Sequence, residues 1–388
     1  MIKFEKSVDR RDTDSMKYDG VEDLYNVKDV IPMWVADMDF AAPQEVISAL
    51  KLKVEHGIFG YPGNTFKYYE AVVNWMKRRH NWEISEDWIF PAPGVVPAIT
   101  AILEEITQPN DKVIIQSPVY HHFYNMVHKV GCEVVDSPLV ERNGKYEMDF
   151  EGLERLICNN VKAFVLCSPH NPVGRVWSKK ELQKLGELCL KHNVTVISDE
   201  IHNDLVFKPN KHTIFTEVDP QFVDNTIICT APSKTFNLAG LQTANIIVPG
   251  ENLRKIVGEK FSKVYNSFPN TMGIEATKAV YKYGDSWLDE LLDYVERNID
   301  YLQEYIEDKM PQIKLIRPQG TYLVWLDMKE VDTKGLSAFE FTLQNAKVVA
   351  EPGEKYGGPS SSIRLNLACH KKTLEKALKQ LSSALQSK

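Results

Sequence analysis

The chain has 388 residues, enough for roughly two domains, and its 43% hydrophobic and 26% charged residues are ordinary for a globular protein. A net charge of −7 and a pI near 5.9 argue against binding to nucleic acid or to an anionic membrane surface. No apolar run reaches the ~18 residues of a membrane span. Residues 1–12 have no apolar signal core and the six cysteines form no CxxC pair, so we expect a reduced, cytoplasmic protein.

The first part of the chain is polar and leads to an aromatic, acidic segment, Trp34–Phe40, which could be a packed loop or part of a cleft wall. A helix is expected from Pro43 to about His56, because proline is tolerated in a first helical turn. After a loop at residues 57–63, a second helix is expected from Phe66 to Arg79, where apolar residues recur on one face.

Strands and helices alternate from Trp88 onward. Short apolar runs end in turn residues and are separated by helical lengths, a pattern typical of a mostly parallel sheet covered by helices on both faces. Strands are expected at residues 88–90, 113–116, 163–167, 194–198, 226–229 and 245–248, with helices ending near 106 and spanning 179–192.

The pattern changes after about Gly284. A long helix, three separated strands and a terminal helix indicate a smaller α+β domain, on which the N-terminal segment is expected to pack. We therefore predict an N-terminal segment at residues 1–45, a large domain at 46–284 and a small domain at 285–388. The helices are expected at 287–309 and 372–385, and the strands at 313–316, 322–326 and 363–367.

One lysine stands at the centre of the predicted chemistry. Lys234 follows the apolar run 226–229 and precedes a turn of small residues, so it is expected at the carboxyl edge of the sheet. Open α/β sheets bind their ligands at that edge. An amine packed there among apolar groups would have a lowered pKa and could attack a carbonyl to form a Schiff base. A surface lysine in a turn is the plain alternative.

Several other unusual residues also follow predicted strands. Asp199 could pair with a cation or cap a helix, and Asn171 could bind a ligand or simply form a turn. Tyr120 could stack on an aromatic ring or fill space, and Gly94–Val96 could offer backbone N–H groups to a phosphate or form a plain turn. One ligand with a phosphate, a basic aromatic ring, a phenolic oxygen and an aldehyde would explain all of them. Pyridoxal 5′-phosphate has these groups.

Three motifs carry a family resemblance. Asn171-Pro172-x-Gly174, Asp199-Glu200-Ile201-His202 and Ser233-Lys234-x-Phe236-Asn237-x-x-Gly240 resemble the signature set of the fold-type I pyridoxal-phosphate enzymes in the class I/II aminotransferase family. The segments 34–40, 117–120 and 199–204 resemble more narrowly the cystathionine and cysteine-conjugate β-lyase branch of MalY/PatB type. The resemblance implies an α/β fold with a mostly parallel sheet in a cofactor-binding large domain and a smaller α+β domain.

The resemblance also implies roles for individual residues. Lys234 would hold the cofactor and act as the base, Asp199 would pair with the ring nitrogen, and Asn171 would bind the ring oxygen. Tyr120 would stack on the ring, and either Tyr120 or protonated Lys234 could protonate the leaving sulfur. Arg364 would clamp the substrate carboxylate. The further expected contacts are Val95, Val96 and Ser233 to the phosphate, Asp37 to the substrate, and Tyr61 to a neighbouring subunit's phosphate and substrate, which implies a homodimer.

Two positions depart from the family pattern. Gln242 stands where many relatives carry a phosphate-binding cation, so the phosphate would depend more on amides and hydroxyls. His202 replaces a tyrosine that is frequent three residues after the aspartate, and it could approach the ring oxygen or serve as a core histidine. The neighbours His121 and His122 lack a third ligand at metal-like spacing, so no metal is expected.

The reaction we predict is β-elimination from an S-substituted L-cysteine such as cystathionine, giving a thiol, pyruvate and ammonia. An aminotransferase would use the same residues up to loss of the Cα proton, and no single residue separates the two reactions. A regulatory protein on the same fold is a third reading, although the complete set of lysine, aspartate, asparagine and arginine favours retained chemistry.

Overall fold

The computed structural model describes residues 4, 8–62, 66–265 and 270–386. A seven-stranded sheet has the order β2-β10-β9-β8-β7-β3-β4, and β10 is antiparallel to both of its neighbours while the other pairs are parallel. The mostly parallel sheet expected from the sequence is therefore confirmed. Its strands are β2 (Ile89–Ala92), β3 (Lys112–Ile115), β4 (Glu133–Asp136), β7 (Val161–Cys167), β8 (Thr195–Asp199), β9 (Thr226–Thr230) and β10 (Ala244–Ile247).

Helices cover both faces of this sheet, as the continuous apolar strands predict. In β7, Phe164 and Leu166 belong to one hydrophobic cluster, whereas Val165 and Cys167 belong to another, because successive side chains point to opposite faces. One face packs against α4 (Val95–Ile106), α5 (His122–Lys129) and α9 (Glu251–Val264). The other face packs against helices that include α3 (Phe66–His80), α6 (Phe150–Ile157), α7 (Lys179–Lys191) and α10 (Thr271–Tyr283).

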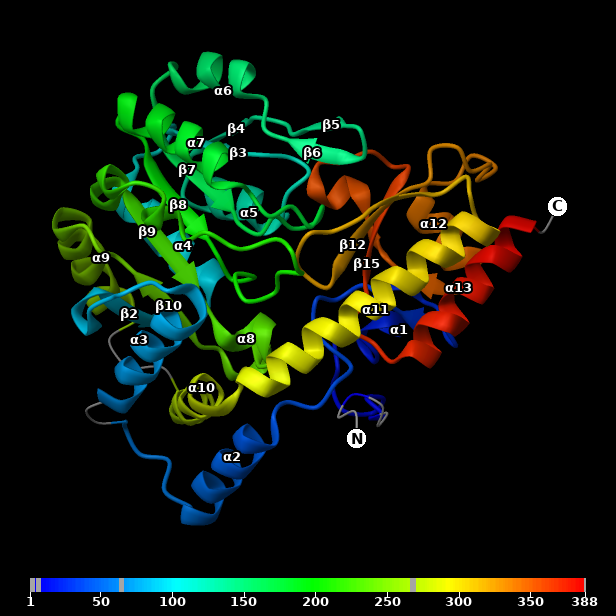
Figure 1. Cartoon of the computed structure of the whole chain (residues 1–388), viewed down its shortest axis with the longest axis horizontal. Coiled ribbons are helices and arrows are strands. Elements are labelled where there is room, and N and C mark those ends of the chain that lie inside the picture. Colours follow the sequence, from blue (N-terminus) through cyan, green and yellow to red (C-terminus); the bar gives the residue numbers. More distant parts are fainter. Residues whose placement is uncertain (1–3, 5–7, 63–65, 266–269, 387–388) are drawn as a thin grey trace.

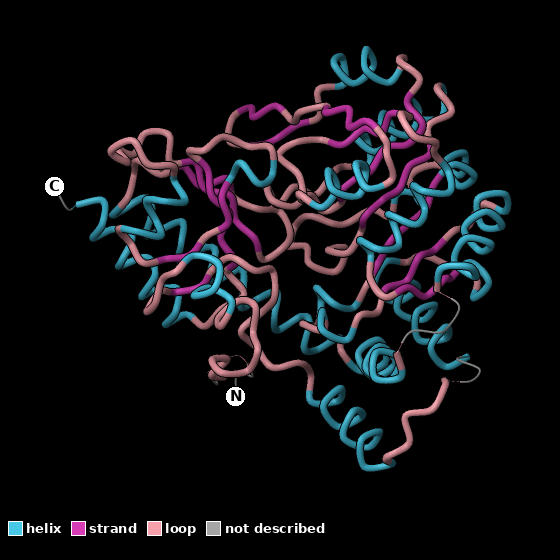
Figure 2. Tube along the Cα trace, turned by 180° about the vertical axis from the view of Figure 1, so that it is seen from behind, coloured by secondary structure: helices cyan, strands magenta, loops and turns pink. Residues whose placement is uncertain are grey.

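A second, four-stranded antiparallel sheet has the order β11-β12-β15-β14 and lies beside two long helices (Figure 1). Figure 2 shows the two groups of strands from behind. Near this sheet, β1 (Ile31–Pro32) pairs in parallel with β13 (Val348–Val349), which joins residues of the N-terminal segment to the C-terminal part. The three-part division of the chain stays a prediction. The elements here are β11 (Lys314–Ile316), β12 (Leu323–Asp327), β14 (Glu351–Pro352), β15 (Ser362–Asn366), α11 (Asp285–Lys309), α12 (Ala338–Gln344) and α13 (Lys371–Gln386).

Some elements had no clear sequence signal. The hairpin of β5 (Val140–Arg142) and β6 (Lys145–Glu147) is short and its residues are half-buried or exposed, so it lacks an apolar alternation. The short helices α1 (Gly20–Tyr25) and α6 were likewise not predicted. By contrast, α2 (Gln44–His56) begins directly after Pro43, as expected. No helix among the described residues is long and apolar enough to cross a membrane.

One glycine brings the loop after β7 against the C-terminal part. Gly174 has a φ of +66°, and a Cβ at this position would lie 2.3 Å from the Pro318 Cβ. Only glycine accommodates both the left-handed backbone and this close approach. Because Gln319 N donates to the Gly174 carbonyl at 2.7 Å, the loop that carries Asn171 is held against the segment that leads into β12.

Candidate active site

The sheet brings the predicted residues to a single edge. β8 and β9 are parallel, with Asp199 opposite Cys229, and β7 runs parallel to β8 with Cys167 opposite Asp199. The carboxyl ends of these strands therefore lie together, and the segments that follow them carry Asn171, Asp199 and Lys234. Tyr120 follows β3, and Val95 and Val96 begin α4 after β2, at the same edge. The topology thus assembles the large-domain half of the site.

Lys234 lies in the four-residue helix α8 (Pro232–Thr235), which directly follows β9. Its amine donates to the carbonyl of Ala36 at 2.8 Å. Desolvation by burial and the positive charge of Arg364 lower the pKa of Lys234 to about 8, although Asp37 and Asp199 act in the opposite direction. A larger fraction of this amine is neutral near pH 7 than of an ordinary lysine, so it is prepared for nucleophilic attack.

The lowered pKa of Lys234 predicts a distinctive pH dependence. Only the neutral amine attacks an aldehyde, so covalent attachment of pyridoxal 5′-phosphate should accelerate as the pH rises and level off above about pH 8, the pKa at this site. Stopped-flow absorbance with the cofactor-free protein would measure the rate. An ordinary lysine, with its pKa of 10.5, would instead show a rate still rising steeply above about pH 9, and that result would contradict the assignment.

Asp199 is a buried carboxylate whose charged form a positive partner would stabilise. It is 5% exposed, and its carboxylate accepts a hydrogen bond from the Ile201 backbone N–H at 3.1 Å. Burial raises the pKa of Asp199 to about 7, against the lowering effects of that hydrogen bond and of Lys234. A basic ring nitrogen beside this carboxylate would supply the cation that favours its charged form.

Arg364 reaches the same place from β15 in the second sheet. The side chain is 2% exposed, with Nη1 donating to Asn171 Oδ1 at 3.1 Å and Nη2 donating to the Trp34 carbonyl at 2.8 Å. Its Nε is buried and has no hydrogen-bond partner among the described residues. A buried guanidinium with an unused donor fits a site for a carboxylate.

The segment Trp34–Phe40 runs between these groups, and side chains of the C-terminal part hold its backbone in addition to Lys234. Tyr322 donates to the Ala36 carbonyl at 3.0 Å, and Asn366 donates to the carbonyls of Val35 and Asp37. The segment is thus part of the site's wall, one of the two alternatives that the sequence left open. Tyr322 and Asn366 were missed because their contacts join residues far apart in the chain.

Asp37 is already engaged in this structure. Its two carboxylate oxygens accept from Arg10 at 2.6 and 2.9 Å, and Arg10 also contacts Asp39 at 3.0 Å. Lys17 lies 2.9 Å from Asp39. The cluster fixes the segment that bears Ala36, so direct contact of Asp37 with a substrate remains a prediction. Arg10 carried no sequence signal that distinguished it from other charged residues.

Tyr120, His121 and His122 lie together at the start of α5. The Tyr120 ring centroid is 5.1 Å from that of His121 and 5.0 Å from that of His122. Burial and the Asp199 charge raise the pKa of Tyr120 to about 12, so its hydroxyl stays protonated. Burial and the charges of Lys234 and Arg364 lower the pKa of His202 to about 3, so that ring is neutral, with a buried Nδ1 that has no partner among the described residues.

The predicted phosphate contacts lie in the first turns of two helices, α4 and α8. Val95 is buried at the first position of α4 after Gly94, and Val96 is half-buried beside it. Free N–H groups and the helix dipole make such a start suitable for an anion. Ser233 is half-buried in α8, whereas Gln242 is exposed, and Tyr61 is 99% exposed on the isolated chain.

Residues 28–381 match the family described as aminotransferase class I and II, and the chain belongs to this family. It is 42% identical to cystathionine β-lyase PatB of Bacillus subtilis (strain 168), over 99% of this chain and 100% of that protein. The expected fold-type I architecture is confirmed by solved structures. Cystalysin from Treponema denticola, which contains a pyridoxal 5′-phosphate cofactor, superposes with a TM-score of 0.94 at 36% identity, over 100% of this chain and 99% of that chain. The cofactor-bound C-S lyase from Staphylococcus hominis gives a TM-score of 0.92 at 32% identity, over 99% and 98% of the two chains.

The residues of this chain fit pyridoxal 5′-phosphate. The buried Asp199 makes no ion pair within 4.0 Å among the described residues, and the Lys234 amine has a lowered pKa. The His202 Nδ1 and Arg364 Nε are also buried without hydrogen-bond partners in this part of the chain. A charged ring, an aldehyde and a substrate carboxylate would satisfy these groups together.

Proposed function

We propose that this chain is a pyridoxal 5′-phosphate-dependent carbon–sulfur β-lyase, which cleaves cystathionine or other S-substituted L-cysteines to a thiol, pyruvate and ammonia. The observation that carries the proposal is the meeting of Lys234, Asp199, Asn171 and Arg364 at one sheet edge. The 42% identity to a cystathionine β-lyase over nearly the whole chain supports this reaction above others of the family.

In this proposal each residue has a defined task. Arg364 binds the α-carboxylate of the substrate, with Asn171 holding the guanidinium in orientation at 3.1 Å. Lys234 would anchor the cofactor, and its free amine would take the Cα proton, a role suited to a base with a pKa near the operating pH. Asp199 would pair with the ring nitrogen and keep it protonated. When bound, the cofactor supplies an electron sink for the carbanion that forms at Cα.

A proton delivered to sulfur would assist departure of the β-thiolate. The Tyr120 hydroxyl, held protonated by its raised pKa, and the protonated Lys234 amine are the two candidate donors. Addition of one water to the remaining three-carbon fragment releases pyruvate and ammonia, so the atoms balance. The proposed phosphate contacts are Val95, Val96 and Ser233. The His202 ring lies beside the Tyr322 ring, with 6.1 Å between the ring centroids.

A product assay separates the lyase from an aminotransferase. With cystathionine and no added keto acid, the protein should form pyruvate continuously, at one equivalent per thiol. An aminotransferase would stop after a single turnover because it needs an acceptor to restore its cofactor. Coupled detection of pyruvate with and without a keto acid measures this difference, and dependence of product on the acceptor would refute the lyase.

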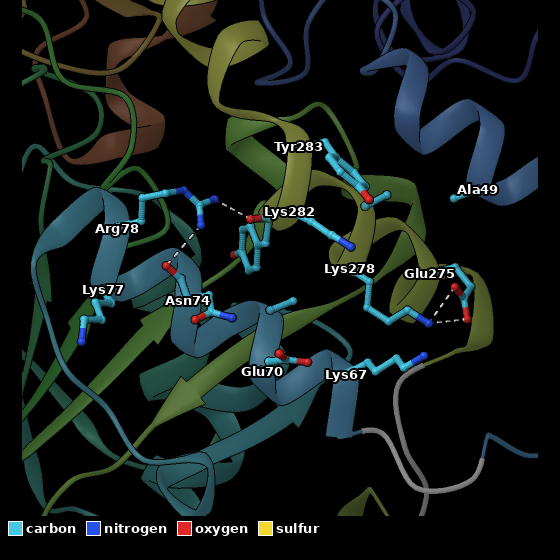
Figure 3. Close-up of a pocket in the computed structure, with 13 residues that line it drawn as sticks. Ala49, Lys67, Glu70, Asn74, Lys77, Arg78, Glu275, Lys278, Lys282 and Tyr283 are labelled. Carbon is cyan, nitrogen blue, oxygen red and sulfur yellow. Dashed lines mark hydrogen bonds and ion pairs between the residues drawn. The ribbon is translucent and has the colours of Figure 1, made fainter.

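We also propose that the protein works as a homodimer. Large apolar side chains are exposed around α2 and the following loop, including Ile58 (65%), Phe59 (56%) and Tyr61 (99%), which is unusual for a free surface. Beside them, α2, α3 and α10 enclose a groove of about 790 Å³ whose wall carries Lys67, Lys278 and Glu275 (Figure 3). A second copy that covers this face would bring Tyr61 to its neighbour's phosphate region, as the family resemblance implies.

A cytoplasmic location is proposed on the basis of the cysteines. All six are free, and five of them are buried. Buried thiols without disulfides suit a reducing compartment.

A further inference from the structure

The reactive lysine lies in a helix that is too short to fix its own position. Helix α8 has four residues, and the Phe236 N–H closes its turn by donating to the Pro232 carbonyl at 2.9 Å. A single helical turn is unfavourable by itself, because several dihedral angles are fixed for each hydrogen bond gained. The placement of Lys234 must therefore come from the contacts of its neighbours.

The three residues after Lys234 supply these contacts in different directions. The Thr235 hydroxyl donates to Asp204 Oδ2 at 2.8 Å. The Phe236 ring packs at 5.5 Å from Trp75, and the Asn237 amide is hydrogen-bonded to the backbone of Met38 at 2.9 and 3.0 Å. Asn237 thus holds the segment that contacts the lysine amine, while Thr235 holds the helix itself.

Asp204 connects this helix to α3. It lies in the turn after β8, is 8% exposed, and accepts from Trp75 Nε1 at 3.1 Å and from His80 Nε2 at 2.8 Å. Burial disfavours its charge, but hydrogen bonds from His80 and Thr235 together with nearby positive charge lower the pKa of Asp204. Its carboxylate is therefore ionised, and hydrogen bonds to an ionised acceptor are shorter and stronger than neutral ones.

We propose that Thr235 is a positioning residue for Lys234, and that its hydroxyl fixes the lysine-bearing helix to α3 through the buried Asp204 carboxylate. The proposal rests on the proposed function of Lys234. Thr235 is fully buried and follows Lys234 directly, so rotation or sliding of α8 moves both side chains together. His80 Nε2 lies 2.8 Å from the other carboxylate oxygen, Oδ1, and Trp75 Nε1 lies 3.1 Å from Oδ1 and 3.3 Å from Oδ2. Thr235 supplies the hydrogen bond that joins α8 to this carboxylate.

Loss of this hydroxyl should slow the chemistry of Lys234. A displacement of about 1 Å at a reacting group can cost about 10²-fold in rate, and partial freedom of a short helix should cost about tenfold. The substitution should lower the rate of cofactor attachment and kcat, which depend on Lys234. Substrate binding should change little, because Arg364 binds the substrate carboxylate from β15. KM should change by less than about twofold.

Paired substitutions test the proposal. Thr235→Val keeps the shape and removes the hydroxyl, whereas Thr235→Ser and Thr235→Ala differ from each other chiefly in the hydroxyl. Trp75→Phe is the control, because it keeps an aromatic ring against Phe236 but removes a different hydrogen bond to the same carboxylate. For each full-length variant, the rate of covalent attachment of pyridoxal 5′-phosphate to cofactor-free protein is measured by absorbance, together with kcat, KM and the thermal unfolding midpoint.

The Val and Ala variants should attach the cofactor about tenfold more slowly than wild type and lose about tenfold in kcat, while the Ser and Trp75→Phe variants stay within about threefold. Equal rates for the Ser and Ala variants would overturn the proposal, as would equal slowing by Trp75→Phe and Thr235→Val. If Thr235→Val does not fold, the Ser and Ala pair decides. Failure of the wild-type protein to take up the cofactor would instead refute the proposed function.

Discussion

Lys234→Ala should abolish both the visible absorbance of bound cofactor and turnover. The substitution removes the amine that forms the covalent bond and the base that takes the Cα proton. Proton transfer by a positioned base alone contributes about 10²–10⁴-fold, so turnover should fall by about 10⁴-fold or more when the anchor is lost as well. Absorbance spectra after desalting and a pyruvate assay with cystathionine measure the two effects.

Two comparisons make the result specific for this lysine. Lys260→Ala removes a lysine of α9 that pairs with Glu104 at 3.0 Å on the outside of the sheet, and it should retain both properties. A small primary amine added to the Lys234→Ala protein should restore part of the turnover, because it can occupy the space of the lost side chain and accept the proton. Retention of absorbance and activity in Lys234→Ala would rule out the assignment.

Asp199→Asn should reduce turnover by about 10²–10³-fold while leaving covalent attachment of the cofactor in place. The substitution keeps the size of the side chain and the acceptor for the Ile201 N–H, but it removes the charge that holds the ring nitrogen protonated. The expected loss of turnover is the loss typical when one charge-stabilising group is removed from a preorganised site. Spectra and kcat are the measurements, and wild-type turnover in the Asn variant would contradict the proposed pairing.

The same variant has a predicted effect on stability without cofactor. Burial raises the pKa of Asp199 from 3.8 to about 7, so the folded protein favours the protonated acid. For a raised carboxyl pKa, stability falls as the pH rises through this range, because the unfolded chain ionises first. Asp199→Asn should therefore raise the unfolding midpoint of the cofactor-free protein at pH 8 and change it little at pH 4.

Asp136→Asn is the control for both measurements. Asp136 also ends a strand, β4, but its carboxylate accepts from the Ser117 N–H at 2.9 Å and from the Ser117 hydroxyl at 2.6 Å. A carboxylate satisfied in this way gains nothing from neutralisation. The Asp136→Asn protein should therefore not gain stability at pH 8, and its kcat should stay within about threefold of wild type.

The sequence predicted the large sheet and the main chemistry for the same reason. Buried parallel strands require continuous apolar runs, and the residues directly after such runs must lie at the carboxyl edge. The positions of Asn171, Asp199 and Lys234 after the runs at 163–167, 194–198 and 226–229 were thus readable from local patterns. The motifs around them identified the family, which the comparisons confirmed.

What the sequence could not predict are contacts between distant segments. The donation from Tyr322 to Ala36 spans 286 residues and that from Arg364 to Trp34 spans 330. Local periodicity describes only neighbours in the chain, so it gives no information about such pairs.

The reactivity of Lys234 depends on both the local sequence and the tertiary structure. The sequence by itself determined that Lys234 follows a buried strand in a family motif, because hydrophobic pattern and motif spacing are local properties. Only the tertiary structure decided how its amine and its helix are held, because Ala36, Asp204 and Arg364 reach it from separate parts of the chain. Their burial and charge, which arise on folding, lower the pKa of Lys234 and prepare it to react.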